Sequence, residues 1–174
     1  MADELLDIVN DHDEVTGQAM RSVVHQQGHQ HRGVHVFLFN EQNEMLIQKR
    51  SADRVNSPSL LDCSVSEHVQ AGESYFEAAM RGLKEEMGVE GIEVQPLGKI
   101  QMEYGLNDNE ISVIYQGRVD PKQVRFDAAE IAEVKYMSLD EIREGIIREK
   151  EIYCGWFVEL MNWYFGKSTR LKVM

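Results

Sequence analysis

Residues 67–89 read EHVQAGESYFEAAMRGLKEEMGV, and this stretch decides how the rest of the chain is interpreted. From Glu73 to Met87 apolar residues recur at spacings of three and four, the period of an amphipathic helix. They are Phe76, Ala79, Met80, Leu83 and Met87. Gly88 follows at a position where a left-handed residue commonly ends a helix. The stretch therefore predicts a helix over 73–87 with one apolar face.

A narrow polar strip on this helix carries Arg81, Glu85 and Glu86. The two glutamates lie about one turn beyond the arginine. Adjacent carboxylates repel each other unless a cation or solvent compensates, and Mg²⁺ and Mn²⁺ prefer such hard oxygen ligands. Taken alone, the helix favours a solvated face with an Arg81–Glu85 ion pair over a metal site.

Strand and helix patterns alternate through the rest of the chain, which predicts a mixed α/β (α+β) domain. Two β-hairpins are expected, at 5–10 with 14–20 and at 34–40 with 44–50. Further strands are expected near 61–66, 92–103, 110–118 and 132–137, and helices over 140–148 and 155–165. We expect one domain over 1–174, with an N-terminal hairpin in 1–24, a core in 25–150 and a C-terminal helix in 153–166. The tail KSTRLKVM is expected to fray.

Composition limits the class of function. The net charge of −12 argues against nucleic-acid binding, which needs clustered Lys and Arg. Apolar runs stay far below the ~20 residues of a membrane span, and the acidic N-terminus MADELLDIVN does not resemble a signal peptide. Cys63 and Cys154 form no CxxC pair. A cytoplasmic protein is therefore expected, without a membrane or nucleic-acid partner.

The 67–89 stretch resembles a Nudix box: Gly, five residues, Glu, seven residues, then Arg-Glu-U-x-Glu-Glu-x-Gly-U, where U is aliphatic. The positions that match are Glu73, Arg81, Leu83, Glu85, Glu86, Gly88 and Val89. The resemblance implies a Nudix fold, in which a mixed β-sheet lies between helices. It also implies that Glu85 and Glu86 ligate Mg²⁺ or Mn²⁺ and that Arg81 orients the glutamates.

Two positions depart from the box. Glu67 stands where the box has its first glycine, and Gly82 stands where the box has the glutamate after its arginine. In the hydrolases that glutamate is a metal ligand or a water activator. We therefore consider a swap, in which Glu67 supplies the carboxylate that Gly82 lacks; the alternative is that Gly82 only makes room and Glu67 is exposed.

Similarity outside the box indicates a particular branch. The segments HRGVHVFLFN (31–40), QKRSADR (48–54) and SVSEHVQAGES (64–74) resemble isopentenyl diphosphate isomerase and its Nudix relatives. In that branch histidines and two acidic residues bind a metal. The matching positions are His31, His68, Asp108 and Glu110, and His25 is one residue out of register. His29 and His35 are instead expected to be a solvated loop residue and a strand-packing residue.

The same resemblance assigns the substrate side. Lys49, Arg50 and Arg54 form the dense basic group in the middle of this acidic chain, and Arg can bind phosphate oxygens through two donors. Tyr104 and Trp156 match isomerase active-site aromatics, which stabilise a carbocation through the ring face. Core packing is the alternative for Trp156.

Ser66 is the main departure from the isomerase. The isomerase has a cysteine there, which moves protons together with a later glutamate, here Glu110. A serine hydroxyl is far less acidic than a thiol, so it is a poor replacement. Cys63 lies three residues earlier, and strand alternation predicts that it points to the opposite face.

Three functions follow from these residues. The first is a Mg²⁺-dependent hydrolase of a diphosphate linkage in a nucleoside diphosphate or related small molecule. The second is an isopentenyl diphosphate isomerase-type enzyme, and the third is a diphosphate- or metal-binding module without catalysis. A homodimer through the N-terminal hairpin or the C-terminal helix is compatible with the sequence.

Overall fold

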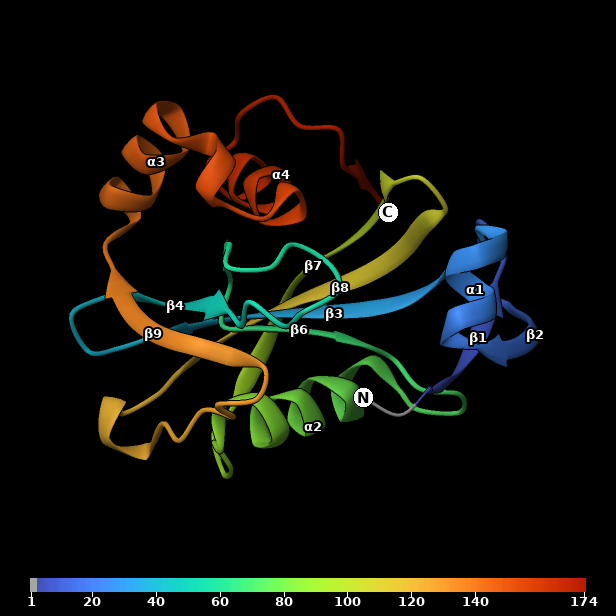
Figure 1. Cartoon of the computed structure of the whole chain (residues 1–174), viewed down its shortest axis with the longest axis horizontal. Helices are drawn as coiled ribbons and strands as arrows, with labels where there is room; N and C mark the ends of the chain where they lie inside the picture. Colours follow the sequence, from blue (N-terminus) through green and yellow to red (C-terminus); the bar gives the residue numbers. More distant parts are fainter. Residues whose placement is uncertain (1–2) are drawn as a thin grey trace.

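A computed structural model of the chain describes residues 3–174 (Figure 1). Its strands are β1 Leu5–Val9, β2 Val15–Met20, β3 His31–Phe39, β4 Met45–Arg50, β5 Leu61–Asp62, β6 Val65–His68, β7 Val94–Gly105, β8 Asp108–Arg118, β9 Ile131–Met137 and β10 Lys172–Val173. Its α-helices are α1 Arg21–Gln27, α2 Tyr75–Met87, α3 Leu139–Arg148 and α4 Gly155–Tyr164, with short 3₁₀ helices at Pro121–Gln123 and Lys150–Ile152.

A mixed sheet forms the middle layer, as the Nudix resemblance predicts. Within the described residues it has eight strands, in the order β10-β7-β8-β3-β4-β5, with β6 paired to β3 and β9 paired to β4. β3 and β8 are parallel, and the other pairs are antiparallel. α2 covers one face of the sheet and α3 and α4 cover the other (Figure 1).

β3 is the strand on which the two cores and the candidate site meet. Val34, Val36 and Leu38 belong to the core under α2, whereas Phe37 and Phe39 belong to the core under α4. This alternation follows from the two-residue period of a strand. At its N-terminal end β3 is paired on both sides, with β8 and β6, and therefore holds residues from three strands side by side.

α2 begins where its sequence signals place it. Ser74 accepts a hydrogen bond from the backbone N–H of Glu77, and the Glu77 side chain accepts one from the Ser74 N–H, a complete capping box. Gly88 ends the helix with φ of 64°, a left-handed conformation that glycine adopts without strain. The expected helix is confirmed, although Phe76 is 51% exposed and Gly82 and Glu86 are buried against the sheet.

Three expected boundaries of elements differ from the structure. The second hairpin strand ends at Met20, where it was expected to end. Residues 21–27 form α1, so the hairpin does not extend to residue 24. β3 begins at His31, earlier than expected. The C-terminal tail does not fray entirely, because β10 pairs with β7 and Leu171 is buried. Residues 1–2 lie outside the described part of the hairpin.

Candidate functional site

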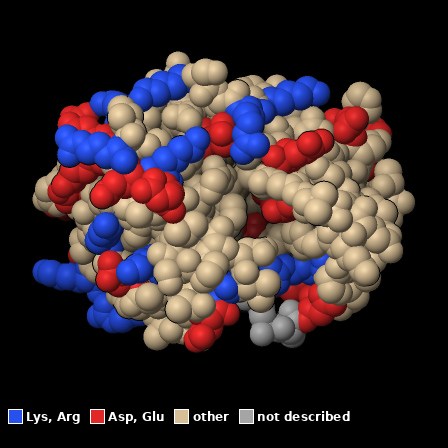
Figure 2. All heavy atoms as spheres, turned by 45° about the horizontal axis from the view of Figure 1, so that its top comes forward, with Lys and Arg blue, Asp and Glu red and all other residues tan. Residues whose placement is uncertain are grey.

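A pocket opens at the end of the sheet where α1, β3, β6, β8 and α4 meet. It is lined by Glu4, Arg21, His25, His35, Arg50, Arg54, Asn56, Ser66, Glu67, His68, Tyr104, Asp108, Glu110 and Trp156. Figure 2 shows a hollow in this face of the molecule with acidic side chains inside it.

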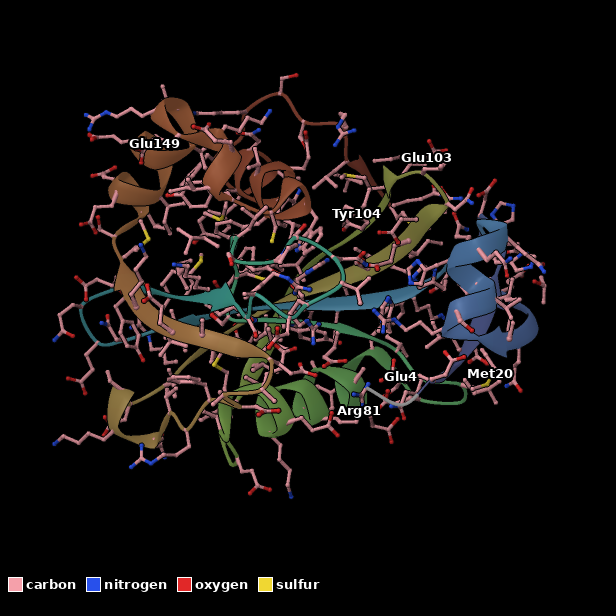
Figure 3. The ribbon with its side chains drawn as sticks, in the orientation of Figure 1. Glu4, Met20, Arg81, Glu103, Tyr104 and Glu149 are labelled. Carbon is pink, nitrogen blue, oxygen red and sulfur yellow. The ribbon has the colours of Figure 1, made fainter. Side chains whose placement is uncertain are left out.

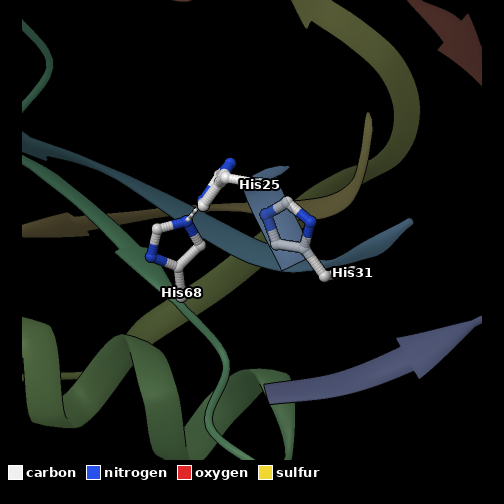
Figure 4. Close-up of side chains that lie close together, drawn as sticks. All are labelled: His25, His31 and His68. Carbon is white, nitrogen blue, oxygen red and sulfur yellow. Dashed lines mark hydrogen bonds between the residues drawn. The ribbon is translucent and has the colours of Figure 1, made fainter. Parts of the chain in front are cut away.

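Three histidines meet at one side of this pocket. His25 comes from α1, His31 from the start of β3 and His68 from the end of β6, and their ring nitrogens lie within 4.8 Å of one another (Figure 4). His25 Nε2 lies 3.3 Å from His68 Nε2. His25, which is one residue out of register with the family pattern, nevertheless lies in this cluster.

Two carboxylates complete this cluster from β8. His31, Asp108 and Glu110 also place one ligand atom each within 4.8 Å of one another. β3 and β8 make this contact directly, because His31 is the register partner of Glu110. Gly33 leaves the room for it, since a Cβ at that position would overlap the Glu110 carboxylate. The Ser112 hydroxyl donates a hydrogen bond to the same carboxylate.

The electrostatics of the cluster favour a cation. Burial lowers the pKa of His25 to about 4, with help from His31, and burial lowers the pKa of His68 well below its ordinary value. Burial and the neighbouring Glu110 raise the pKa of Asp108 to about 6. For Glu110 burial alone would raise the pKa, but the hydrogen bond and charge of His35 outweigh it and lower the pKa to about 2. The rings of His25 and His68 are therefore neutral and present lone pairs beside the ionised Glu110 carboxylate.

Two buried atoms in the cluster lack hydrogen-bond partners, namely His31 Nε2 and Asp108 Oδ1. Buried polar atoms normally find a partner, and one without a partner calls for an explanation. Imidazole nitrogens together with carboxylate oxygens suit Mn²⁺, Zn²⁺ and related divalent ions. The residues present therefore fit a divalent cation, as the resemblance predicts for all five of them.

Arg81 organises the box helix. Its guanidinium donates to Glu73 at 3.0 and 3.1 Å and to the backbone carbonyl of His68 at 2.8 Å. Longer contacts of 3.4 and 3.3 Å reach Glu67 and Glu85. Arg81 thus joins α2 to the end of β6, which is the orienting role predicted for it. The pKa of Arg81 is raised: burial opposes this, but the acidic partners outweigh it.

Glu67 occupies the space that Gly82 leaves open. A Cβ at Gly82 would lie 2.9 Å from Glu67 Cγ and 2.6 Å from Val65 Cγ1. The Glu67 side chain therefore packs against α2 at Gly82, in the space that a larger side chain at residue 82 would need. Its side chain is only 15% exposed, so the alternative of a solvent-exposed Glu67 was wrong.

Glu67 and Glu86 form a buried acidic pair. Burial raises the pKa of Glu67 to about 7, and Glu4 raises it further while Arg81 lowers it. Burial and the charge of Glu67 raise the pKa of Glu86 well above its ordinary value. Gln48 donates a hydrogen bond of 2.8 Å to Glu86 Oε2 and holds that carboxyl group in place.

Some predicted residues lie outside this arrangement. Glu85 has a 57% exposed side chain, contacts Arg81 and is not among the residues that line the pocket. Lys49 does not line the pocket either. Arg50 and Arg54 do, but both have protein partners: Arg50 donates to the Asn56 carbonyl at 3.0 and 3.1 Å, and Arg54 lies 2.9 Å from Glu130.

Sequence reasoning missed four residues of the site. Arg21 and Glu4 reach the pocket from the N-terminal segment, in which no motif marks them. Glu130, just before β9, raises the pKa of both Glu67 and Glu86. His35 was expected only to pack in its strand, yet it lines the pocket. The available signal was its spacing: His35 lies two residues before Phe37, so it is on the same face of β3, the face that α4 covers.

His35 and Ser66 are direct cross-strand partners. His35 Nδ1 lies 3.0 Å from Ser66 Oγ, and its Nε2 lies 3.2 Å from the Tyr104 hydroxyl and 3.6 Å from Glu110 Oε1. The Ser66 hydroxyl therefore does not stand alone. Its proton can be exchanged with an imidazole, which is a better acid–base group than a serine.

The expected orientation of Cys63 was wrong. Its Sγ lies 3.3 Å from Ser66 Oγ, on the same side and not on the opposite face. The chain bends between β5 and β6, so strand alternation does not extend from Ser66 back to Cys63. Cys63 is nevertheless fully buried, and burial raises the pKa of its thiol, which keeps the thiol protonated.

Tyr104 and Trp156 close the pocket on the side of α4. Their rings meet edge to face at 6.4 Å, and Tyr104 lies on the side of the sheet that α4 covers (Figure 3). The Trp156 indole N–H donates to Asp62 at 2.9 Å, and the Arg50 guanidinium lies 5.4 Å from the indole ring. Trp156 thus both packs on the core and lines the pocket.

Comparisons with known proteins agree with this geometry. The NUDIX domain family model matches residues 29–154. An isopentenyl-diphosphate Delta-isomerase 2 from Photorhabdus laumondii is 30% identical over 92% of this chain and 92% of its own length. A Nudix hydrolase from Deinococcus radiodurans is 42% identical over 52% of this chain and 53% of its own length.

A solved structure from Deinococcus radiodurans superposes with a TM-score of 0.79 at 30% identity, covering 92% of this chain and 98% of that one. A MutT protein structure from Methanosarcina mazei, at 23% identity and a TM-score of 0.62, supports the fold alone. No helix within the described residues is long and apolar enough to cross a membrane. From the family model and the relatives of nearly full length, we conclude that the chain belongs to the Nudix family.

Proposed function

We propose that the protein hydrolyses a diphosphate linkage in a small molecule and depends on Mg²⁺ or Mn²⁺. The observation that carries this proposal is the exchange between Glu67 and Gly82. The box glutamate is absent from the helix, and a strand glutamate fills the space where its side chain would begin. Glu67 lines the pocket and forms an acidic pair with Glu86, which is buried and does not line it.

A divalent cation bound there would polarise a phosphoryl oxygen and lower the pKa of a bound water. The residues that would hold it are Glu67 and Glu86. Gln48 fixes the Glu86 carboxyl group, and Arg81 holds the strand end that carries Glu67. Without a cation the pair retains a proton, because burial and the charge of Glu67 raise the pKa of Glu86 well above its ordinary value, and a cation would replace that proton.

Phosphate oxygens would be bound by arginines that face the same pocket. Arg54 is the main candidate, because a substrate phosphate can replace its partner Glu130. Arg21 faces the pocket from α1. Arg50 is fixed by Asn56 and by Asp62, 3.6 Å away, so it supplies a stationary positive charge.

A second candidate reaction is isomerisation of an isopentenyl-type diphosphate. The histidine–carboxylate cluster, the aromatic pair and the near-complete overlap with relatives named isopentenyl-diphosphate isomerases favour it. Such a reaction adds a proton to one carbon of a double bond and removes a proton from another. Ser66, His35 and Glu110 are the groups in the pocket that could exchange those protons.

The test begins with substrate identity. The protein with Mg²⁺ or Mn²⁺ is incubated with CDP, a nucleoside triphosphate, ADP-ribose and isopentenyl diphosphate, and proton and phosphorus NMR spectra are followed together. New monophosphate or phosphate signals that vanish in Glu86→Gln support hydrolysis. A shifted double bond with an intact diphosphate supports isomerisation. Metal-dependent broadening without turnover leaves only a binding function and overturns both enzyme proposals.

A reciprocal exchange then tests the carboxylate position. Glu67→Gly removes the carboxylate, and Gly82→Glu forces a side chain into Val65 and Glu67. Each single variant should lose most of the activity. The double variant restores the family pattern and removes the overlap with Glu67, while the Val65 side chain must still shift, so it should recover activity well above the product of the two single effects. Additive losses would show that Glu67 does not replace the box glutamate.

A further inference from the structure

The N-terminal segment places a carboxylate inside the pocket. Glu4 precedes β1, lines the pocket and has an 18% exposed side chain (Figure 3). Its backbone carbonyl accepts a hydrogen bond from Arg21 N–H at 2.7 Å, and the Leu5 carbonyl accepts one from Ala71 N–H at 2.8 Å. Asp3 accepts hydrogen bonds from the N–H and hydroxyl of Ser22. The chain on both sides of Glu4 is therefore fixed.

Glu4 faces one particular nitrogen of His68. The Nε2 of this ring points into the histidine cluster, 3.3 Å from His25 Nε2, and its Nδ1 points away (Figure 4). The Glu4 carboxylate lies on that outer side, with Oε2 3.9 Å from His68 Nδ1. A carboxylate on the outer side cannot ligate an ion that the inner nitrogen binds, so Glu4 is not a further ligand of that ion.

His31 has an equivalent arrangement. Its Nδ1 lies 3.1 Å from the His29 carbonyl, while its buried Nε2 faces the cluster without a partner. Metal-binding histidines generally donate their outer N–H to a carbonyl or a carboxylate, which fixes the tautomer and makes the inner nitrogen a stronger ligand. A histidine that ligates a cation through one ring nitrogen is neutral and carries its single proton on the other, so the tautomer decides whether Nε2 is free to bind.

We propose that Glu4 is the positioning residue of the histidine–carboxylate centre: its carboxylate accepts the Nδ1 proton of His68 and so directs the Nε2 lone pair at the cation. This inference rests on the divalent-cation site described above, and it applies to hydrolysis and isomerisation alike. It gives the N-terminal segment a role that neither its sequence nor the family resemblance indicates.

The same contact joins the N-terminal unit to the core. Residues 3–27 carry Glu4 and Arg21, and they also carry the cluster ligand His25. A cation bound by His25 and His68 would close this unit on β6, and Glu4 would act on the same ring from the other side. Cation binding should therefore protect the amides of β1 and α1 from hydrogen exchange.

The test uses Co²⁺ alone, without substrate, because its visible absorption reports nitrogen coordination. Glu4→Ala should weaken Co²⁺ binding at the histidine centre by about 10–100-fold, the usual effect of losing such an outer partner. Glu4→Gln keeps an accepting oxygen and should lose less. Glu41→Gln removes the same charge from an exposed turn and serves as the matched control. His68→Gln identifies the absorption that belongs to this centre.

A second readout addresses the tautomer directly. Nitrogen-15 NMR of the metal-free protein should show His68 protonated at Nδ1, and Glu4→Ala should shift the ring towards the Nε2–H form. A purely structural role for Glu4 would leave both tautomer and affinity unchanged. Unfolding curves in chelator should show that the variant folds as well as the wild type.

The outcomes separate this inference from the proposed function. Co²⁺ affinity of Glu4→Ala within twofold of that of Glu41→Gln, or an Nε2–H tautomer in the wild type, overturns the role of Glu4 and leaves the hydrolase proposal intact. Absence of any Co²⁺ absorption that depends on His68 overturns the metal centre itself, and the role of Glu4 with it. The reciprocal exchange at residues 67 and 82 tests the acidic pair Glu67/Glu86, so its failure would overturn the hydrolase proposal without affecting the role of Glu4.

Discussion

Replacing Glu67 by Gln should change the stability of the metal-free protein and its metal affinity in opposite directions. In the metal-free protein the substitution removes a buried carboxylate that opposes Glu86, so at neutral to alkaline pH it should stabilise the fold. In the presence of Mg²⁺ it removes a predicted ligand, so it should weaken binding. Few other roles for a buried glutamate combine these two effects.

The magnitude follows from the pKa of Glu67, which is raised from 4.5 to about 7 by burial. A raised acid pKa means that ionisation costs folding free energy. This cost is absent below pH 4.5, grows as the pH rises, and is complete above about pH 7. Its upper limit is about 3 kcal/mol. The opposing contact with Arg81 at 3.4 Å is already contained in this pKa, so Glu67→Gln should stabilise the metal-free fold by at most about 3 kcal/mol.

The assay is urea unfolding in chelator at about pH 5 and about pH 8. The wild type should lose stability between these values relative to the variant, and the two should converge at the lower pH. Adding Mg²⁺ should stabilise the wild type more than Glu67→Gln. The Mg²⁺ affinity of the variant should fall at least about tenfold, because even a residue that only hydrogen-bonds a metal ligand typically contributes that much. Glu85→Gln is the matched control, because Glu85 lies on the same helix, contacts Arg81 and is 57% exposed.

One result would refute the reasoning. If Glu67→Gln is no more stable than Glu85→Gln at about pH 8, burial does not disfavour the Glu67 carboxylate in the folded protein. The stability argument for a cation beside Glu67 would then fail.

Three further predictions concern other parts of the pocket. Gly33→Ala should displace the Glu110 carboxylate and weaken Co²⁺ binding at the histidine centre at least about tenfold, measured by titration of its visible absorption; unchanged binding would exclude Glu110 as a ligand. Ser66→Cys should raise isomerisation of isopentenyl diphosphate measured by proton NMR, because a thiol is the better acid; no gain would count against the second candidate function. Arg54→Ala should raise KM about 10–100-fold with little change in kcat, as expected for a lost charged hydrogen bond to phosphate; a fall in kcat alone would contradict a binding role.

Much of the fold was predictable because its signals are local. The capping box at Ser74, the glycine at residue 88 and the apolar spacing of α2 each act within a few residues. The strands of the core were predictable for the same reason. β10 was not, because its two residues pair with β7 and have no apolar alternation of their own. α1 was missed because a helix of seven residues leaves too short a pattern.

The site was predictable where the family motif is fixed in spacing, and less so elsewhere. His31, His68 and the box residues lie at such positions. Glu4 and Arg21 reach the pocket, and Glu130 acts on Glu67 and Glu86, only through tertiary contacts, so no spacing in the sequence marks them. His35 was misjudged because a histidine in an apolar strand usually packs, and only the pairing of β3 with β6 reveals that it faces Ser66.

The exchange of Glu67 for a helix carboxylate has a consequence for how the two candidate centres interact. A carboxylate carried by α2 would approach Glu86 from within the same helix. Carried by β6, it is adjacent in sequence to His68, so the strand that supplies the acidic pair also supplies the histidine cluster. Arg81 holds this junction through the His68 carbonyl and Glu67. A displacement of this end of β6 would therefore move a residue of both centres. A chain with the glutamate on the helix would lack that covalent link between its acidic pair and its histidines.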